Sequence, residues 1–230
     1  PRSPGSSPRR SPRAPAPGRH PWRSRDNRSL CLFQLKPPAV SIKRALLSLL
    51  SCVLAPRMVY GWRTPDGRLL RHTRVSTHAH VEYRDTLHIG DHVFIGHFNF
   101  LDASGGLTIG EGCQITNHVS ILTHSSHHAL RVCGRGYYGH PRPPGYRQAS
   151  TEIGPYCFIG PHAVIAPGTK LGRGVLVTAY SYVSGTVPDF AVVQGQPARV
   201  VGDVRDVDRT LLKLHPEMRE HYRAWAGELP

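Results

Sequence analysis

Five histidines lie within one short segment of the chain, ITNHVSILTHSSHHALRVCGRGYYGH at residues 115–140, and this segment contains no aspartate or glutamate. An imidazole has an unperturbed pKa near neutrality, so it is suited to accept a proton during catalysis or to bind a metal ion. The cluster therefore predicts a general base, a metal site or a group of solvated surface histidines. Its members are His118, His124, His127, His128 and His140.

A sequence repeat predicts the elements that position these histidines. An aliphatic residue returns every six positions over much of the chain, and glycine often follows it. A period of six fits neither an α-helix nor an isolated strand. It is typical of a solenoid in which each hexad forms a short strand and a corner, so that equivalent side chains stack in one apolar column. The repeating residues are Ile89, Ile95, Leu101, Ile109, Ile115, Ile121, Ile153, Ile159, Ile165, Leu171, Val177 and Val183.

The period is interrupted at two places. Two extra residues precede Ile109, and about 26 extra residues precede Ile153. A long insertion in a regular scaffold is where functional residues concentrate, so we expect the loop at 125–150 to belong to the site. Upstream, a weaker period that ends at Leu87 predicts an atypical first coil over residues 69–86, because terminal repeats cap the core.

The N-terminal region has a different composition. Residues 1–38 contain eight arginines, one lysine and one aspartate, so they carry +8 of the formal charge of +14. This basic Pro/Arg/Ser-rich tail is predicted to be disordered, because it has too little apolar surface to bury. Residues 39–55 have leucines at helical spacing but are too short to span a membrane, which predicts an amphipathic helix. That helix either packs on the domain or lies on a membrane surface.

The five cysteines form no CxxC pair, which favours a reducing compartment and hence a cytoplasmic location, with peripheral membrane contact through 39–55 as the alternative. Nucleic-acid binding has only the basic tail in its favour, and we do not expect it.

Two phrases suggest a family. The ending VPDFAVVQGQPARVVGDV (187–204) and the segment HVSILTHSSHHALR (118–131) resemble the hexapeptide-repeat acyltransferases, the second phrase in particular their sugar O-acetyltransferase branch. The resemblance spans about residues 69–204. It implies an all-β domain that is a single-stranded left-handed parallel β-helix with three hexads per turn. A helix and connection at 39–68 would precede this domain, and a helical segment at 205–230 would follow it.

The resemblance also implies site residues. The base in such enzymes is a histidine shortly after an ILT-like strand, which here predicts His127. The segment is one residue longer than in maltose-type enzymes, so His124 is the alternative. The acceptor-binding asparagine of the family corresponds to Asn99, which could equally be an internal residue hydrogen-bonded along the coil.

The remaining candidates bind substrate. The family places the acetyl-CoA arm against Ala179 and Ser184 and a CoA phosphate near Arg199, and it places the co-substrate between neighbouring prisms of a homotrimer. Relatives often carry lysine at Gly185, so one phosphate contact is in doubt. In the insertion, arginine and tyrosine side chains suit a sugar or its phosphate through stacking and bidentate hydrogen bonds. These insertion residues are Arg131, Arg135 and Tyr137.

We therefore expect an acetyltransferase that moves an acetyl group from acetyl-CoA to a hydroxyl of a sugar or glycan precursor by direct histidine-assisted attack, with no metal. Two alternatives stay open. One is a zinc-dependent, carbonic anhydrase-like β-helix, since His92 and His97 have part of the ligand spacing, although a third histidine is missing. The other is a β-helix that serves as a non-catalytic scaffold.

Overall fold

The computed structural model describes residues 42–228, so the predicted disordered tail at 1–38 lies outside the described residues. The chain divides into two units after Ser51. The first described element, α1 (Ile42–Leu54), is the helix expected within 39–55. No helix in residues 42–228 is long and apolar enough to cross a membrane. Several leucines of α1 are exposed: Leu46, Leu47, Leu49, Leu50 and Leu54.

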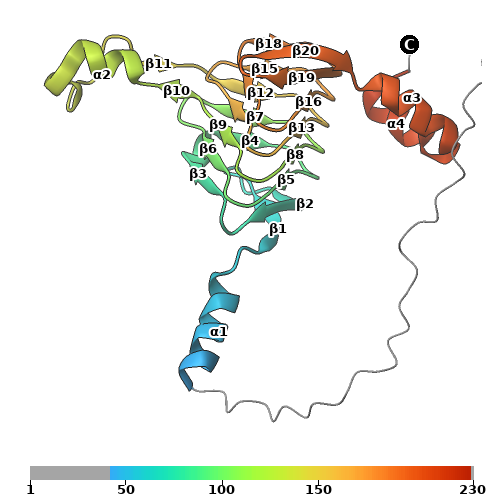
Figure 1. The fold of residues 1–230 in the computed structure, drawn as a ribbon, viewed down its shortest axis with the longest axis horizontal. Helices are drawn as coiled ribbons and strands as arrows, with labels where there is room; N and C mark the ends of the chain where they lie inside the picture. Colours follow the sequence, from blue (N-terminus) through green and yellow to red (C-terminus); the bar gives the residue numbers. More distant parts are fainter. Residues whose placement is uncertain (1–41, 229–230) are drawn as a thin grey trace, which may run out of the picture. The chain divides into compact units, whose positions relative to one another are not determined.

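Very short strands form three parallel sheets, one for each hexad of a turn (Figure 1). The first sheet contains β5 (Phe94–Ile95), β8 (Gln114–Ile115), β13 (Phe158–Ile159) and β16 (Leu176–Val177). The second contains β4 (Leu87–Ile89), β7 (Leu107–Ile109), β12 (Thr151–Ile153), β15 (Lys170–Leu171) and β18 (Thr186–Val187). The third contains β3 (His80–Glu82), β6 (Phe100–Asp102), β9 (Ser120–Ile121), β14 (Val164–Ile165) and β17 (Tyr182–Val183). This arrangement agrees with the β-helix that the repeat and the resemblance predict.

The core is the predicted apolar column. Leu101 stacks on Ile121, and Ile159 stacks on Val177. Nearly all of these side chains are buried completely. Burial of each aliphatic side chain contributes roughly 1.5–3 kcal/mol, which makes the column the main source of stability. The column continues beyond the predicted hexads through Val187.

The first coil forms as predicted, with one correction. Val75 pairs with Ile95, as a first coil requires. Leu87, however, pairs with Leu107, and it is Ile89 that pairs with the column residue Ile109. A short 3-10 helix, η1 (Arg84–Thr86), occupies the corner before Leu87 and shifts the six-residue count by two. Ile89, rather than Leu87, therefore continues the main column.

Antiparallel hairpins close both ends of the first sheet. β1 (Met58–Arg63) pairs with β2 (Leu69–Ser76), and β19 (Ala191–Gly195) pairs with β20 (Ala198–Asp203). We expected only a helix and a connection over 39–68, so β1 was not predicted. The hairpins provide hydrogen-bond partners for strand edges that would otherwise be open.

Helices accompany the coil, so the description as all-β is wrong in detail. The insertion contains β10 (His124–Ser125), α2 (His127–Cys133), η2 (Gly134–Tyr137) and β11 (Arg147–Gln148), and is therefore more than a loop. The predicted C-terminal helical segment consists of α3 (Arg205–Leu214), η3 (Pro216–Met218) and α4 (Arg219–Ala226). Trp225 of α4 stacks on Tyr156 at a corner of the coil, with ring centroids 4.5 Å apart.

Candidate active site

A buried carboxylate contacts one histidine of the cluster. Nδ1 of His124 lies 2.7 Å from Oδ2 of Asp102. The Asp102 side chain has no exposure to solvent, whereas one third of the His124 side chain is exposed. The imidazole therefore has a carboxylate behind it and an accessible edge in front, as a general base requires.

Hydrogen bonds hold Asp102 in its ionised form. Its Oδ2 accepts from the amide and hydroxyl of Thr123, both at 2.8 Å, and its Oδ1 accepts from the amide of Ser104 at 2.9 Å. Burial by itself would raise the pKa of the Asp102 carboxyl, but the hydrogen bonds from Ser104 and Thr123 outweigh burial and lower that pKa. An ionised carboxylate can only accept hydrogen bonds, so the proton lies on Nδ1 of His124. Its Nε2 is then the nitrogen free to take a proton.

The coil brings these two residues together. Leu101 of β6 stacks on Ile121 of β9, so the residues that follow each strand lie at the same corner. The insertion is closed at its base by the pairing of β10 with β11, which sets His124 opposite Gln148. Nε2 of Gln148 donates to the carbonyl of Ser104 at 2.8 Å, which ties the insertion to the coil below.

A cavity of about 650 Å³ lies in front of His124. Its lining combines the start and end of the insertion with two later coils. A cavity of this size is suited to a small substrate or to the end of a larger one. The lining residues are Leu122, His124, Ser125, His127, Arg147, Ala149, Ala166, Pro167, Gly168, Tyr182, Ser184 and Gly185.

His127 lines the same cavity but has no carboxylate partner within residues 42–228. It is the first residue of α2, and its Nδ1 lies 2.6 Å from the hydroxyl of Ser125. The centroid of its ring lies 4.0 Å from the centroid of the His128 ring. The proximity of His127, burial, and the positive charges of Arg131 and Arg147 lower the pKa of His128. The geometry therefore favours His124 as the base over our first choice, His127.

The predicted acceptor residues have different positions. Asn99 is buried and its amide is used inside the coil, where Nδ2 donates to the carbonyl of Thr116 at 2.6 Å and Oδ1 accepts from the amide of Val119 at 2.7 Å. The structure thus does not bring Asn99 to the cavity. Arg131 lies on α2 with its guanidinium against His128, and Arg135 lies on η2; neither lines the cavity.

Tyr137 lines a second cavity, of about 530 Å³, within the insertion. Tyr146 and Gln148 also line it. The Tyr146 ring stacks on His124 with centroids 5.7 Å apart, so this aromatic cavity adjoins the base. Burial raises the pKa of the Tyr146 hydroxyl, which keeps that group neutral.

Of the three predicted acetyl-CoA residues, Ser184 lines the cavity with His124, whereas Ala179 and Arg199 do not. Ala179 lies at the corner that follows the first sheet, and Arg199 lies on β20. The zinc site suggested by the spacing of His92 and His97 does not form, since Nδ1 of His97 lies 2.7 Å from the hydroxyl of Ser76 rather than beside His92.

Sequence reasoning missed Asp102, Tyr146 and Arg147. Asp102 had a detectable signal, because it directly follows a column residue, Leu101, one coil before the ILT strand. Counting one 20-residue turn from Asp102 reaches position 122, two residues before His124. No comparable signal identified Tyr146 or Arg147.

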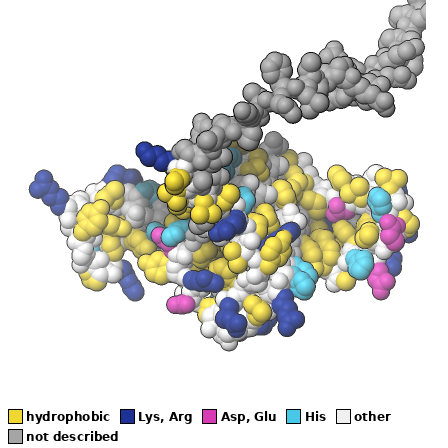
Figure 2. All heavy atoms as spheres, turned by 90° about the horizontal axis from the view of Figure 1, so that it is seen from below, with side chains coloured by type: hydrophobic (Ala, Val, Ile, Leu, Met, Phe, Trp, Pro, Cys, Tyr) yellow, Lys and Arg dark blue, Asp and Glu magenta, His cyan; other side chains and the backbone are white. Residues whose placement is uncertain are grey.

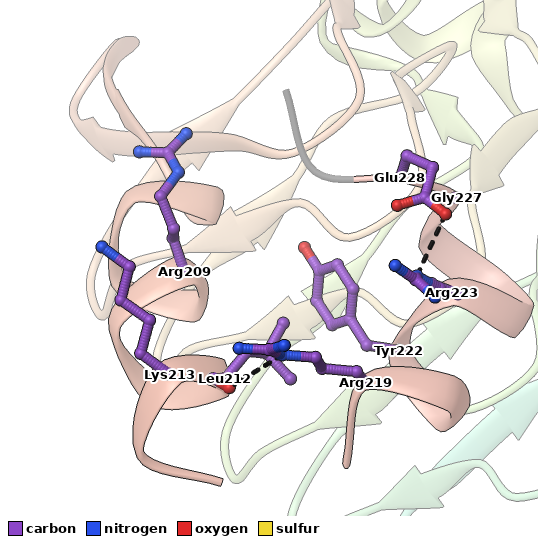
Figure 3. Close-up of a pocket in the computed structure, with 8 residues that line it drawn as sticks. All are labelled: Arg209, Leu212, Lys213, Arg219, Tyr222, Arg223, Gly227 and Glu228. Carbon is purple, nitrogen blue, oxygen red and sulfur yellow. Dashed lines mark hydrogen bonds and ion pairs between the residues drawn. The ribbon is translucent and has the colours of Figure 1, made fainter. Parts of the chain in front are cut away.

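A groove between α3 and α4 is a less suitable active site (Figure 3). Its volume is about 210 Å³, and the eight residues that line it include no histidine. Two of its arginines already have partners: Nε of Arg223 lies 3.0 Å from a carboxylate oxygen of Glu228, and Nε of Arg219 donates to the carbonyl of Leu212. We therefore assign this groove to the packing of the two helices.

Comparison with known proteins agrees with this geometry. Residues 150–185 match the family model described as "Bacterial transferase hexapeptide (six repeats)", and curated acetyltransferases align over more than half of the chain. Residues 150–185 therefore contain repeats of this bacterial transferase type. Two of these relatives differ in the acceptor that their names give, which is a galactoside in one and serine in the other.

Galactoside O-acetyltransferase of Escherichia coli (strain K12) is 31% identical over 134 residues, which are 57% of this chain and 61% of that protein. Serine acetyltransferase 4 of Arabidopsis thaliana is 32% identical over 129 residues, which are 56% of this chain and 33% of that protein. The matches therefore span less than two thirds of these relatives. A solved galactoside acetyltransferase in complex with coenzyme A is 28% identical, with a TM-score of 0.46, and the match covers 56% of this chain and 60% of that one.

Proposed function

We propose that this hexapeptide-repeat protein is an acetyltransferase that moves an acetyl group from acetyl-CoA to a hydroxyl of a small acceptor. The observation that carries the proposal is the pair formed by Asp102 and His124 at the wall of a cavity. Relatives named as acetyltransferases and a solved relative that binds coenzyme A support this choice of reaction and co-substrate.

In the proposed reaction, Nε2 of His124 takes the proton of the acceptor hydroxyl as its oxygen attacks the thioester carbonyl carbon. The bond between that carbon and sulfur then breaks, and the proton passes from His124 to the sulfur, so that CoA leaves as the thiol and the imidazole becomes neutral again. Asp102 keeps the imidazole in the required tautomer and stabilises its positive charge between these two steps. No covalent enzyme intermediate is needed.

The co-substrate is proposed to lie between neighbouring subunits of a homotrimer. Within one chain, Ser184 lies beside His124, whereas Ala179 and Arg199 lie elsewhere on the prism. A groove in which one subunit supplies His124 and the next supplies Ala179 and Arg199 would use all four residues. Figure 2 shows lysine and arginine side chains scattered over one face of the chain. Among the predicted residues, the guanidinium of Arg199 is the group that suits a CoA phosphate.

The acceptor is proposed to be a sugar or glycan precursor held in the aromatic cavity of Tyr137 and Tyr146, since aromatic rings stack well on sugars. A second acceptor class has one observation in its favour. Arg147 lines the cavity with His124, and a guanidinium suits a carboxylate such as that of serine.

The test is thiol release from acetyl-CoA by the full chain with neutral sugars, acidic sugars and serine as acceptors. His124→Ala should lower kcat by about 100-fold to 10,000-fold. His127→Ala and His128→Ala are matched controls and should lower kcat less than tenfold. A large loss in His127→Ala alone would move the base to His127, and activity in every variant would refute the assignment of a histidine base.

A further inference from the structure

Two histidines and an aspartate meet at an edge of the prism that the proposed reaction does not use. His72 lies on β2, while Asp91 and His92 lie at the corner between β4 and β5. One potential ligand atom from each of these side chains lies within 4.8 Å of the other two. The catalytic pair lies at a different corner, where the chain leaves β9.

Backbone contacts fix this arrangement. One oxygen of Asp91, Oδ1, accepts from the amide of His92 at 2.8 Å, from the amide of His72 at 3.0 Å and from the hydroxyl of Thr73 at 3.2 Å. Thr73 is itself fully buried. The carboxylate is thus held in place before any ion binds, which lowers the entropic cost of binding.

The other ligand atoms are available. Among the described residues, neither the second oxygen of Asp91 nor any ring nitrogen of His72 or His92 has a hydrogen-bond partner. The two imidazole rings lie face to face with centroids 4.5 Å apart and planes 15° from parallel. Both histidines are exposed, so small rotations about their side-chain bonds can turn the nitrogens toward a shared ion.

We propose that His72, Asp91 and His92 bind one divalent transition-metal ion, with zinc as the best match. Two imidazoles and one carboxylate are a common ligand set for zinc, with water completing a tetrahedral site.

The role that follows is structural. The ion would join the β1–β2 hairpin to the corner of the next coil. These segments are held here by two residue pairs between β2 and β5 and by the hydrogen bonds to Asp91. Binding to the folded state alone stabilises that state in proportion to the logarithm of the metal concentration. The site would therefore stabilise the N-terminal end of the coil and leave the chemistry at His124 unaffected.

The test uses the full chain after removal of metal with a chelator. Zinc bound per chain is measured by titration calorimetry, and cobalt is used as a spectroscopic probe of tetrahedral coordination. The wild type should bind one more zinc per chain than the His72→Ala/His92→Ala double variant. At zinc concentrations about 100 times Kd, Tm of the wild type should rise by about 5–10 °C.

A control variant removes two other exposed histidines, His88→Ala and His221→Ala, and should keep both the extra zinc and the rise in Tm. Zinc bound by the histidine cluster around His124 would be the same in the wild type, the His72→Ala/His92→Ala variant and the control variant. It therefore does not affect the difference in bound zinc between them. Equal zinc binding by the wild type and the His72→Ala/His92→Ala variant would overturn the proposal. So would an equal loss in the control variant.

Discussion

Nδ1 of His124 lies 2.7 Å from Oδ2 of Asp102, although 21 residues separate them along the chain. The same oxygen also accepts from the amide of His124 at 3.1 Å, so the carboxylate fixes both the backbone and the ring of this residue. A base held in this way needs little reorganisation when the acceptor binds, which is the basis of the predictions on catalysis.

Asp102→Asn should lower kcat by about 100-fold to 10,000-fold and leave KM for acetyl-CoA within about threefold. The asparagine amide group would face the donors of Thr123 and His124, so the imidazole would lose its preferred tautomer. Steady-state kinetics well below Tm measure this effect. A large rise in KM with an unchanged kcat would instead indicate a role in binding.

Asp102 also predicts how stability depends on pH. Its pKa is lowered in the folded state, so its contribution is complete above the ordinary carboxyl pKa of about 3.9 and is lost as pH falls toward the lower folded value. The free energy of unfolding of the wild type should decline more steeply between about pH 5 and pH 2 than that of Asp102→Asn. Urea titrations at each pH measure this, with the exposed Asp206→Asn as a control that keeps the wild-type slope.

Arg147→Gln should raise KM for acidic acceptors by about 10-fold to 100-fold, because a hydrogen bond between charged groups contributes roughly 1.5–3 kcal/mol. KM for neutral sugars should stay the same. Arg135→Gln is the matched control, since Arg135 belongs to the same insertion but lines neither cavity. An equal change for neutral and acidic acceptors would exclude recognition of charge by Arg147.

Gly110→Ala should destabilise the coil by about 1–3 kcal/mol. A Cβ at Gly110 would lie 2.5 Å from the backbone nitrogen of Pro155 in the next coil, so backbone would have to move. Gly136→Ala, where a Cβ would meet no atom within 4 Å, should change stability by less than about 0.5 kcal/mol. Thermal unfolding compares the two, and equal Tm values would show that the coils separate easily.

Much of the fold was predictable because its period is local. The identity of residues six apart determines which side chains face inward, and stacking then follows for every coil from Ile89 to Val183. The position of the insertion was predictable for the same reason. The β1–β2 hairpin was not, because antiparallel pairing at a chain end leaves no period of six.

The site was predicted only in part. The sequence by itself identified a histidine cluster at the start of the insertion, with His124 and His127 as its candidates, and it indicated a hexapeptide-repeat protein. The sequence could not decide between His124 and His127 as the base, since each lies within a few residues of the same strand. Only the tertiary structure showed that Asp102 lies behind His124, because the stacking of coils joins residues about 20 positions apart. Only the structure, likewise, showed that Asn99 points into the coil, because the direction of a polar side chain depends on the hydrogen-bond partners that surround it.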